Sequence, residues 1–475
     1  MSPILALLVW LVLLVALLVF DPATPPKTSL TLWVPVIWMF IDGTRLPSQW
    51  IGGQISTAAE AYEDGNPINR AISLALILLA AGILLARNSN WRRFVASNAA
   101  LLAFLLFALI SVVWSDFPFV AFKRWFRDLG PYLAILIPLT DHRPEEAVAT
   151  VLRRLSYLLV PLSILLFKYF PEIGMQYDGW TGSRMFVGPT TSKNMLGLLC
   201  LVSAVYFFWD LACRWPERKE KRTKRILLID VIFLVMTVWV LHLAASTTSD
   251  VCAAMGCLVV LAASSKVFKR RPNLLKGLIP LAFVVYLILN FGLGMNGSMA
   301  EAVGKDPTLT DRTRIWALLL SMHTNPLLGT GYQSFWLGPR LDYIWNFGGF
   351  GHVNEAHNGY IQVYLDLGFI GVALLIGFLI ASYRSICKRW TPSSKLPILG
   401  MATWLTLLFY NMSEAAFERG LLFMMFLMAA IAVPGRISKK IVVRSSEAAN
   451  TNRDQEFTVS LKHRWDGYGY SDTTP

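Results

Sequence analysis

The residues that could do chemistry include a histidine and an asparagine, His357 and Asn358, which stand directly before a long apolar run, "GYIQVYLDLGFIGVALLIGFLI". A helix that only crosses a bilayer needs neither of them. At a helix N-terminus the backbone dipole favours a neutral imidazole, and a neutral imidazole can take a proton from an attacking hydroxyl. His357 is therefore predicted to be a general base. The alternative is a structural histidine near a membrane surface.

A second stretch, "DGWTGSRMFVGPTTSKNMLGLL", combines cations with the start of a helix. Arg184, Lys193 and Asn194 lie in a loop that glycine and proline interrupt and that leads into an apolar helix. Three hydroxyl residues could cap that helix: Thr190, Thr191 and Ser192. Two cations beside a free helix N-terminus are suited to bind a phosphate. The alternative is that both cations pair with lipid headgroups.

A third stretch, "TLTDRTRIWALLLSMHTNPLLGTGYQSFW", predicts a helix that Thr310 or Asp311 caps and that ends near residue 324, before "NPLLGTG". Arg312 and Trp316 are four residues apart, so they share one face and could stack. Arg314 points nearly the other way, so Arg312 is the arginine expected to face a site. The alternative is an amphipathic helix at the membrane surface whose cations are ordinary.

Metal binding is not expected from these patterns. His352 and His357 are five residues apart, which is not the spacing of two ligands on one helix face, and Glu355 is the acidic residue near them. The five cysteines fall within apolar runs or at their ends, with no zinc or disulfide spacing: Cys200, Cys213, Cys252, Cys257 and Cys387. No cofactor is expected either.

The elements that must position these residues are membrane helices. The chain has 475 residues, of which 55% are hydrophobic and 15% charged, and its mean hydropathy is +0.51. Repeated apolar runs predict an all-α polytopic bundle of about twelve or thirteen transmembrane helices. The expected membrane domain covers residues 1–434, with a long outer loop at about 294–356 that carries short helices. A polar tail over 435–475 is expected to be cytoplasmic and disordered.

The distribution of charge predicts the topology. The net charge of +13 is concentrated in loops such as "CRWPERKEKRTKR" and "KVFKRRPNLLK", which the positive-inside rule assigns to the cytoplasm. The remaining loops, including 43–69, 168–193 and 294–356, then lie together on the outer side. The positive net charge is therefore explained by cytoplasmic loops, and nucleic acid is not an expected partner. The first apolar run lacks a basic n-region and a cleavage site, so it is expected to be a retained span.

These motifs, in this order, resemble those of the O-antigen ligase and polysaccharide polymerase superfamily of bacterial envelope glycosyltransferases. The similar segments are "RTRIWALLLSMHTNPLLGTG", "HNGYIQVYLDLGFIG" and "GSRMFVGPTTSKNMLG". The segment "WMFIDGTRLPSQWIG" is similar to an early outer loop of the exopolysaccharide-polymerase branch, with Thr44-Arg45 where a Ser-Arg pair is usual. The resemblance runs from about residue 38 to 434. Asp311 departs from it, because the family often has glycine before the arginine.

The resemblance implies transfer of a glycan from a polyprenyl-pyrophosphate carrier to an acceptor sugar or glycolipid at the periplasmic face of the inner membrane. It implies three catalytic residues: Arg184 and Arg312 at the pyrophosphate, and His357 as the base. The expected substrate-binding residues are Lys193, Asn194, Arg314, Trp316, Asn358 and Tyr360. Outer-loop aromatics could stack on sugars or anchor at the interface: Tyr332, Phe335, Trp336, Tyr343 and Trp345. Membrane lipids and a chain-length regulator are further candidate partners, and the transferase is expected to be metal-independent.

Within that family, the "GTRLPSQWIG" segment favours a polymerase of exopolysaccharide or O-antigen repeat units over a ligase to lipid A core. A transferase that glycosylates proteins differs only in its acceptor. An alternative of another class is a transporter or flippase of lipid-linked glycans, for which charged residues near the midplane and symmetric halves are expected. The turn "SEAAFERG", with Glu414, Glu418 and Arg419, is the charged feature that this alternative could use.

Overall fold

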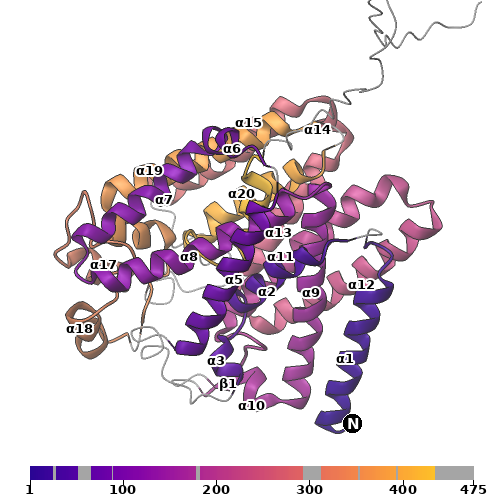
Figure 1. The fold of residues 1–475 in the computed structure, drawn as a ribbon, viewed down its shortest axis with the longest axis horizontal. Helices are drawn as coiled ribbons and strands as arrows, with labels where there is room; N and C mark the ends of the chain where they lie inside the picture. Colours follow the sequence, from indigo (N-terminus) through magenta and orange to yellow (C-terminus); the bar gives the residue numbers. More distant parts are fainter. Residues whose placement is uncertain are drawn as a thin grey trace, which may run out of the picture. The chain divides into compact units, whose positions relative to one another are not determined.

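The computed structural model describes residues 1–24, 28–51, 66–87, 89–177, 182–292, 312–350, 353–391 and 394–433. Within them the regular structure is almost entirely helical (Figure 1). A two-stranded antiparallel sheet pairs β1 (Met175–Tyr177) with β2 (Arg184–Phe186). The predicted all-α class is therefore confirmed. Three expected features lie outside the described residues: the cap at Thr310 or Asp311, His352, and the tail over 435–475.

Eight helices in the described part of the chain are long and apolar enough to cross a membrane. They are α1 (Pro3–Phe20), α5 (Pro67–Leu85), α9 (Pro144–Tyr169), α11 (Lys193–Arg214, with a span that continues to Glu217), α12 (Lys221–Ala244), α13 (Thr247–Ser264), α15 (Pro272–Leu287, with a span that continues to Phe291) and α19 (Gly359–Arg389). A ninth is possible if α6 (Trp91–Ser97) and α7 (Ala99–Ile110) count as one span, although an 86° bend separates them. The protein is thus a multi-pass membrane protein.

The expected count of twelve or thirteen spans included apolar runs that form shorter helices. Three helices in the described residues are apolar but short: α2 (Trp33–Asp42), α20 (Leu396–Tyr410) and α21 (Leu421–Ala430). The 22-residue helix α8 (Pro118–Leu139) carries charged residues, among them Arg124 and Asp128, and falls outside the apolar set. Composition alone therefore overestimates the number of spans, because polar turns shorten some apolar helices and internal charges exclude others.

Short helices fill several connections. They are η1 (Leu30–Leu32), α3 (Pro47–Trp50), α10 (Pro171–Gly174), η2 (Ser111–Trp114), η3 (Trp215–Glu217), α14 (Lys266–Arg270) and η4 (Ile288–Gly292). In the described part of the long loop before α19, the chain forms α17 (Arg312–Ser321) and α18 (Pro339–Phe347). Helix α17 ends three residues before the predicted end, and the "TNP" sequence at 324–326 prevents the helix from continuing further.

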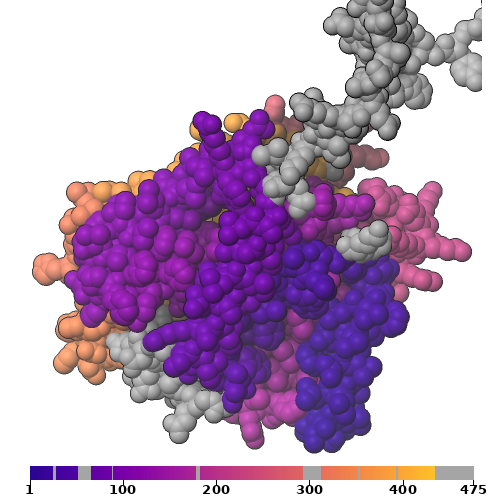
Figure 2. Space-filling view, in the orientation of Figure 1, coloured from indigo at the N-terminus to yellow at the C-terminus, as the bar shows by residue number. Residues whose placement is uncertain are grey.

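Helix α1 shows how the outer surface of the bundle meets its surroundings. Figure 2 shows this helix, in indigo, on the surface, and it packs against α9 on its other side. Ile4, Val12 and Phe20 are 73%, 69% and 80% exposed. In water such a continuous apolar surface promotes aggregation, but in a bilayer it faces lipid tails.

The centre of the bundle lies around α20 and α21. Every residue of α21 is buried, and α20 packs against both α21 and α13. Helix α11 packs against α9, α12 and α13. The turn between α20 and α21 therefore begins and ends in the most buried part of the protein, and this placement explains how its acidic residues come to be enclosed.

A break in α19 locks the long loop onto the bundle. Gly368 has φ +63°, which glycine adopts without strain, and the break frees backbone groups on either side. Thr330 N and Gly331 N donate to the carbonyls of Leu365 and Asp366, while Phe369 N donates to Pro326 O. The "NPLLGTG" segment thus replaces the hydrogen bonds that α19 loses, and this fixes the loop that leads from α17.

Candidate functional site

Glu414 is the residue on which the predicted stretches meet. It lies in the turn between α20 and α21 and is only 6% exposed. Its Oε1 accepts a hydrogen bond from Arg312 Nη2 at 2.7 Å and another from Asn194 Nδ2 at 2.9 Å. Its Oε2 lies 3.4 Å from His357 Nδ1. One buried carboxylate therefore joins α17, α11 and the segment before α19.

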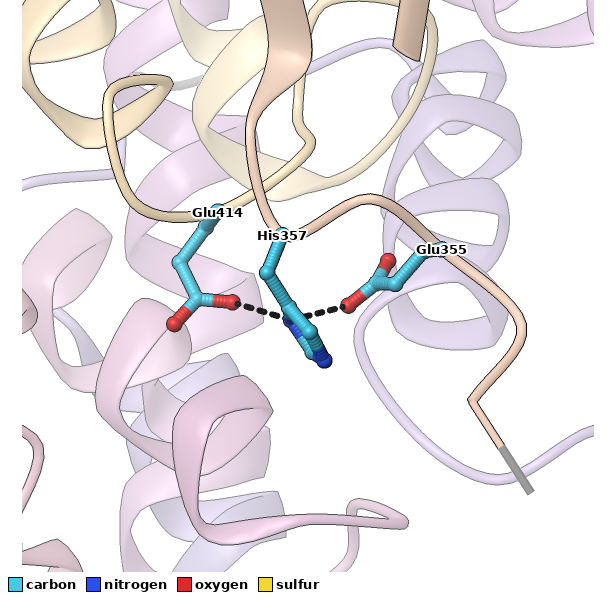
Figure 3. Close-up of side chains that lie close together, drawn as sticks. All are labelled: Glu355, His357 and Glu414. Carbon is cyan, nitrogen blue, oxygen red and sulfur yellow. Dashed lines mark hydrogen bonds and ion pairs between the residues drawn. The ribbon is translucent and has the colours of Figure 1, made fainter. Parts of the chain in front are cut away.

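The imidazole of His357 lies between two carboxylates. Its Nδ1 is 3.1 Å from Glu355 Oε1 and 3.4 Å from Glu414 Oε2. Figure 3 shows both acids facing that nitrogen, while the other ring nitrogen points away from them. A proton on Nδ1 satisfies the carboxylates, so Nε2 is the atom that can exchange a proton with a substrate. The side chain is 28% exposed, so part of the ring is open to solvent.

The backbone around His357 is held from both sides. His357 itself has φ +46°, a strained value for a residue with a side chain. Before it, Trp316 Nε1 donates to Ala356 O at 2.8 Å. After it, Asn358 caps α19 by accepting from Tyr360 N and Ile361 N. These contacts compensate for the strain and hold the imidazole against Glu414.

Asn358 and Tyr360 also tie α19 to the turn that carries Glu414. Asn358 Nδ2 donates to Met412 O at 3.2 Å, and the Tyr360 hydroxyl donates to Leu408 O at 3.2 Å. Gly359 N donates to Asn411 O at 2.9 Å. In this structure the residues expected to bind substrate beside His357 thus make structural contacts, as does Trp316, which does not stack on Arg312 but supports Ala356.

The protonation of His357 differs from the expected one. Burial alone would lower its pKa, but hydrogen bonds and charges from Glu355 and Glu414 raise the pKa of His357 to about 9. In turn, His357 holds the pKa of Glu355 below its usual value, although burial opposes this effect. The prediction of a neutral imidazole at the helix end is therefore wrong for the protein without substrate. Two nearby carboxylates outweigh the helix dipole, and the imidazolium is favoured at neutral pH.

The other predicted cations lie apart from this cluster. Arg184, in β2, and Lys193, the first residue of α11, are both exposed. Among the described residues, neither forms a hydrogen bond or ion pair with Glu414, whereas Asn194 does. Arg314 is exposed on α17 and lies over the Phe350 ring at 5.4 Å. Ser192 caps α11 by accepting from Met195 N, which settles the choice among the three hydroxyl residues.

The loop aromatics divide by exposure. Tyr332, Phe335 and Trp336 are buried, and the Trp336 indole donates to Gln362 Oε1 at 3.0 Å. Their faces are therefore packed within the protein and unavailable to a sugar. Tyr343, at 50% exposed, remains accessible.

The residue that sequence reasoning missed is Glu414. The sequence alone places it only in a charged turn that a transporter could use. The available signal was an ionisable group between two wholly apolar segments, "MATWLTLLFY" and "LLFMMFLMAA", because such groups in membrane proteins are rare and commonly functional. Its partners could not be read from the chain, since they are 57, 102 and 220 positions away.

The cluster also contains a possible set of metal ligands. One ligand atom from each of Glu355, His357 and Glu414 lies within 4.8 Å of the others. The expectation that only Glu355 accompanies the histidine is corrected by this geometry, because Glu414 comes from a distant segment. A guanidinium from Arg312 already pairs with Glu414, and Nδ1 must lose its proton before it could ligate a metal.

Comparison with known proteins gives the class. Residues 231–376 match the family described as O-Antigen ligase, and this segment contains both Arg312 and His357. Together with the all-α membrane fold and the relative described next, the match supports the resemblance to the O-antigen ligase-like superfamily. That family implies a glycosyl-transfer enzyme, a ligase or polymerase of envelope polysaccharide.

A curated relative narrows the comparison. The chain is 26% identical over 317 residues to the exopolysaccharide production protein ExoQ of Rhizobium meliloti (strain 1021). The aligned region covers 64% of this chain and 68% of the relative. The resemblance inferred from the sequence motifs is thereby confirmed.

Proposed function

We propose that this protein polymerises exopolysaccharide repeat units. It transfers a saccharide from a polyprenyl-pyrophosphate carrier to an acceptor sugar hydroxyl at the periplasmic face of the bacterial inner membrane. The observation that carries the proposal is the meeting of Asn194, Arg312 and His357 on Glu414. The relative named for exopolysaccharide production favours a polymerase, and the basic loops, which the positive-inside rule assigns to the cytoplasm, support the periplasmic orientation.

In the proposed reaction, the neutral form of His357 accepts the acceptor's hydroxyl proton on Nε2 while Nδ1–H faces Glu355 and Glu414. The hydroxyl oxygen then bonds to the anomeric carbon of the donor. The bond from that carbon to the carrier's phosphate oxygen breaks, and its electron pair leaves with the pyrophosphate. The carboxylates hold the ring in position and stabilise the imidazolium that forms, as an acid does in other histidine-based sites.

The cations have two roles in this proposal. Arg312 positions Glu414 through one nitrogen, and its remaining N–H groups are available to the leaving pyrophosphate, because a guanidinium has five donors. Arg184 and Lys193 are exposed and bind the negative charge that grows on the pyrophosphate in the transition state.

The test is transfer by purified protein in detergent with a polyprenyl-linked repeat unit as both donor and acceptor. Wild-type protein should give products longer than one unit. His357→Ala should abolish them while the protein remains inserted and abundant, and Arg312→Lys should slow them. Ser321→Ala, an exposed change on α17, serves as the control and should have no effect. Persistent transfer by His357→Ala would falsify the assignment of the base, and an inactive wild-type protein would favour the transporter.

A ligase to lipid A core is the second candidate, because the matching family is described as O-Antigen ligase. A strain that lacks the protein separates the two activities. If the protein is a polymerase, long chains disappear while single units still reach the final acceptor. If it is a ligase, full-length chains accumulate on the carrier.

A further inference from the structure

A small polar pocket adjoins the His357 cluster on the side of Glu355. Its walls come from the turn that carries Glu414, from the start of α19 and from the loop after α17; they include Gln333, Asn354, Glu355, Gln362, Glu418 and Arg419. The cavity volume is about 30 Å³. A cavity needs about 10–15 Å³ to hold one water molecule, so this pocket has room for one or two hydroxyl-sized groups and not for a whole sugar ring.

Gln333, which belongs to the wall of this pocket, has an unused acceptor. The residue is 4% exposed, and its Oε1 has no hydrogen-bond partner. Its Nε2 donates to Asp128 Oδ2 at 2.6 Å, which fixes the amide so that the oxygen cannot exchange places with the nitrogen. Its backbone carbonyl accepts from Arg124 Nη1 at 2.5 Å, and its φ is +47°. The side chain is thus held in one orientation with its acceptor unsatisfied.

Glu418 provides a second acceptor of the same kind. Its Oε1 is buried without a hydrogen-bond partner, while its Oε2 lies 3.5 Å from Gln333 Nε2. Burial and neighbouring carboxylates raise the pKa of Glu418 to about 8. A carboxyl group in this state can accept a hydrogen bond and also donate one.

The lining defines the chemistry of a ligand. Buried acceptors without donors are rare in folded proteins, and each destabilises the protein. A ligand that supplies O–H donors satisfies them, whereas a phosphate ion supplies only acceptors; the charges of Glu355 and Arg419 in the wall oppose each other and do not favour it. Hydroxyl groups match the pocket both in size and in hydrogen bonding.

We propose that this pocket is the acceptor subsite: it receives the hydroxyl-bearing edge of the terminal sugar of a neutral glycan, whose hydroxyls donate to Gln333 Oε1 and Glu418 Oε1. The sugar ring remains outside the pocket, and its reacting hydroxyl lies against Nε2 of His357. This inference rests on the proposed function, because it assigns a role to the neighbour of the proposed base. It adds that the acceptor's terminal sugar carries no phosphate at this edge.

The test measures KM for the acceptor separately from KM for the donor. Glu418→Met keeps the length of the side chain and removes the acceptor, so KM for the acceptor should rise about tenfold, the effect of one lost hydrogen bond to a buried group. Glu418→Gln restores an oxygen at the same place and should recover most of the affinity. KM for the donor should not change. The matched control is Glu217→Gln, an exposed acid in η3.

Several outcomes overturn the subsite. The proposal is refuted if Glu418→Met has the same KM for the acceptor as the wild-type protein. It is also refuted if Glu418→Met and Glu418→Gln have equal KM values, because that result indicates a packing role for the side chain. If the Glu418→Met variant does not fold, the proposal can still be tested with wild-type protein and two different acceptors. A repeat unit released from its carrier by mild acid should accept at least tenfold better than the same unit phosphorylated on a primary hydroxyl, and equal use of both refutes the proposal.

Failure of the proposed function can be distinguished from failure of the subsite. The carrier-free repeat unit should bind to His357→Ala protein, which lacks the proposed base but retains the pocket, and Glu418→Met should weaken that binding. Binding without any transfer by wild-type protein refutes the polymerase but keeps the subsite. Transfer by wild-type protein without this binding pattern refutes the subsite alone.

Discussion

The rate of glycan transfer should rise with pH up to about 9, because only the neutral form of His357 accepts a proton. Its two carboxylate partners raise the pKa of His357 to about 9. At pH 7, two units lower, about 1% of the protein then carries the neutral base, and each unit below 9 changes the rate about tenfold. The measurement is the initial rate of chain growth at saturating donor and acceptor, in buffers from about pH 6 to about pH 10.

Glu355→Gln tests the physical cause of this profile. The substitution preserves shape while it removes one of the two charges beside Nδ1, which lies 3.1 Å from the Glu355 oxygen. The pKa of His357 falls, so the midpoint of the profile moves to lower pH. Glu217→Gln removes the same charge from an exposed site and should leave the midpoint in place. A rate that declines as the pH rises through 9 refutes the reasoning, because the imidazolium is then the active form.

Folding stability must be followed across the same window. The pKa of His357 is higher in the folded protein, at about 9, than in an unfolded chain, at about 6.5. Its stabilising contribution is therefore complete below pH 6.5 and is lost as the pH rises through 9. The two pKa values correspond to about 3 kcal/mol, which solvent screening reduces because the side chain is 28% exposed. The melting temperature in detergent should fall over this range, and less so in His357→Ala.

Three further results follow from the site. Arg312→Ala removes one of the two cations beside the buried Glu414 and leaves His357 as the other, so the free energy of unfolding should fall by at most about 3–5 kcal/mol, as denaturation in detergent can measure; an unchanged value indicates that His357 and water compensate the carboxylate. Gly359→Ala places a Cβ 2.0 Å from Asn411 Oδ1, so stability should fall by about 1–3 kcal/mol and transfer should slow as the turn moves. A chelator such as EDTA should leave transfer unchanged, because Arg312 already neutralises Glu414. Activity that is lost with EDTA and restored by a divalent cation assigns a metal to the histidine cluster instead.

The fold class could be predicted from the sequence because it depends on composition. Apolar runs in a chain with 15% charged residues require helices in a membrane. The lengths of the helices were less predictable. The bend of 86° between α6 and α7 follows a single residue, Asn98, between them, and the break at Gly368 depends on a loop that packs across it.

Part of the candidate site was also within reach of sequence reasoning. The three stretches with unusual polar residues were recognised, and Asn194, Arg312 and His357 from those stretches lie on one carboxylate. The carboxylate itself was not assigned, because periodicity within a helix carries no information about contacts between helices. The prediction of a neutral His357 is wrong for the same reason. The helix dipole is a local property that the sequence reveals, whereas Glu414 approaches from a distant turn.

The charges around His357 explain why separate cations are required for the donor. At neutral pH the cluster contains two cations, Arg312 and His357, and two anions, Glu355 and Glu414, so its net charge is close to zero. Because this net charge is small, the remaining N–H groups of Arg312 supply hydrogen bonds to a pyrophosphate but little net charge, and further cations are needed. The exposed Arg184 lies in the segment that leads into α11, ten residues before Asn194, which contacts Glu414. The buried charges therefore hold His357 and its carboxylate partners in position. The exposed cations on the adjoining segment remain available to the leaving group, where most of the negative charge develops.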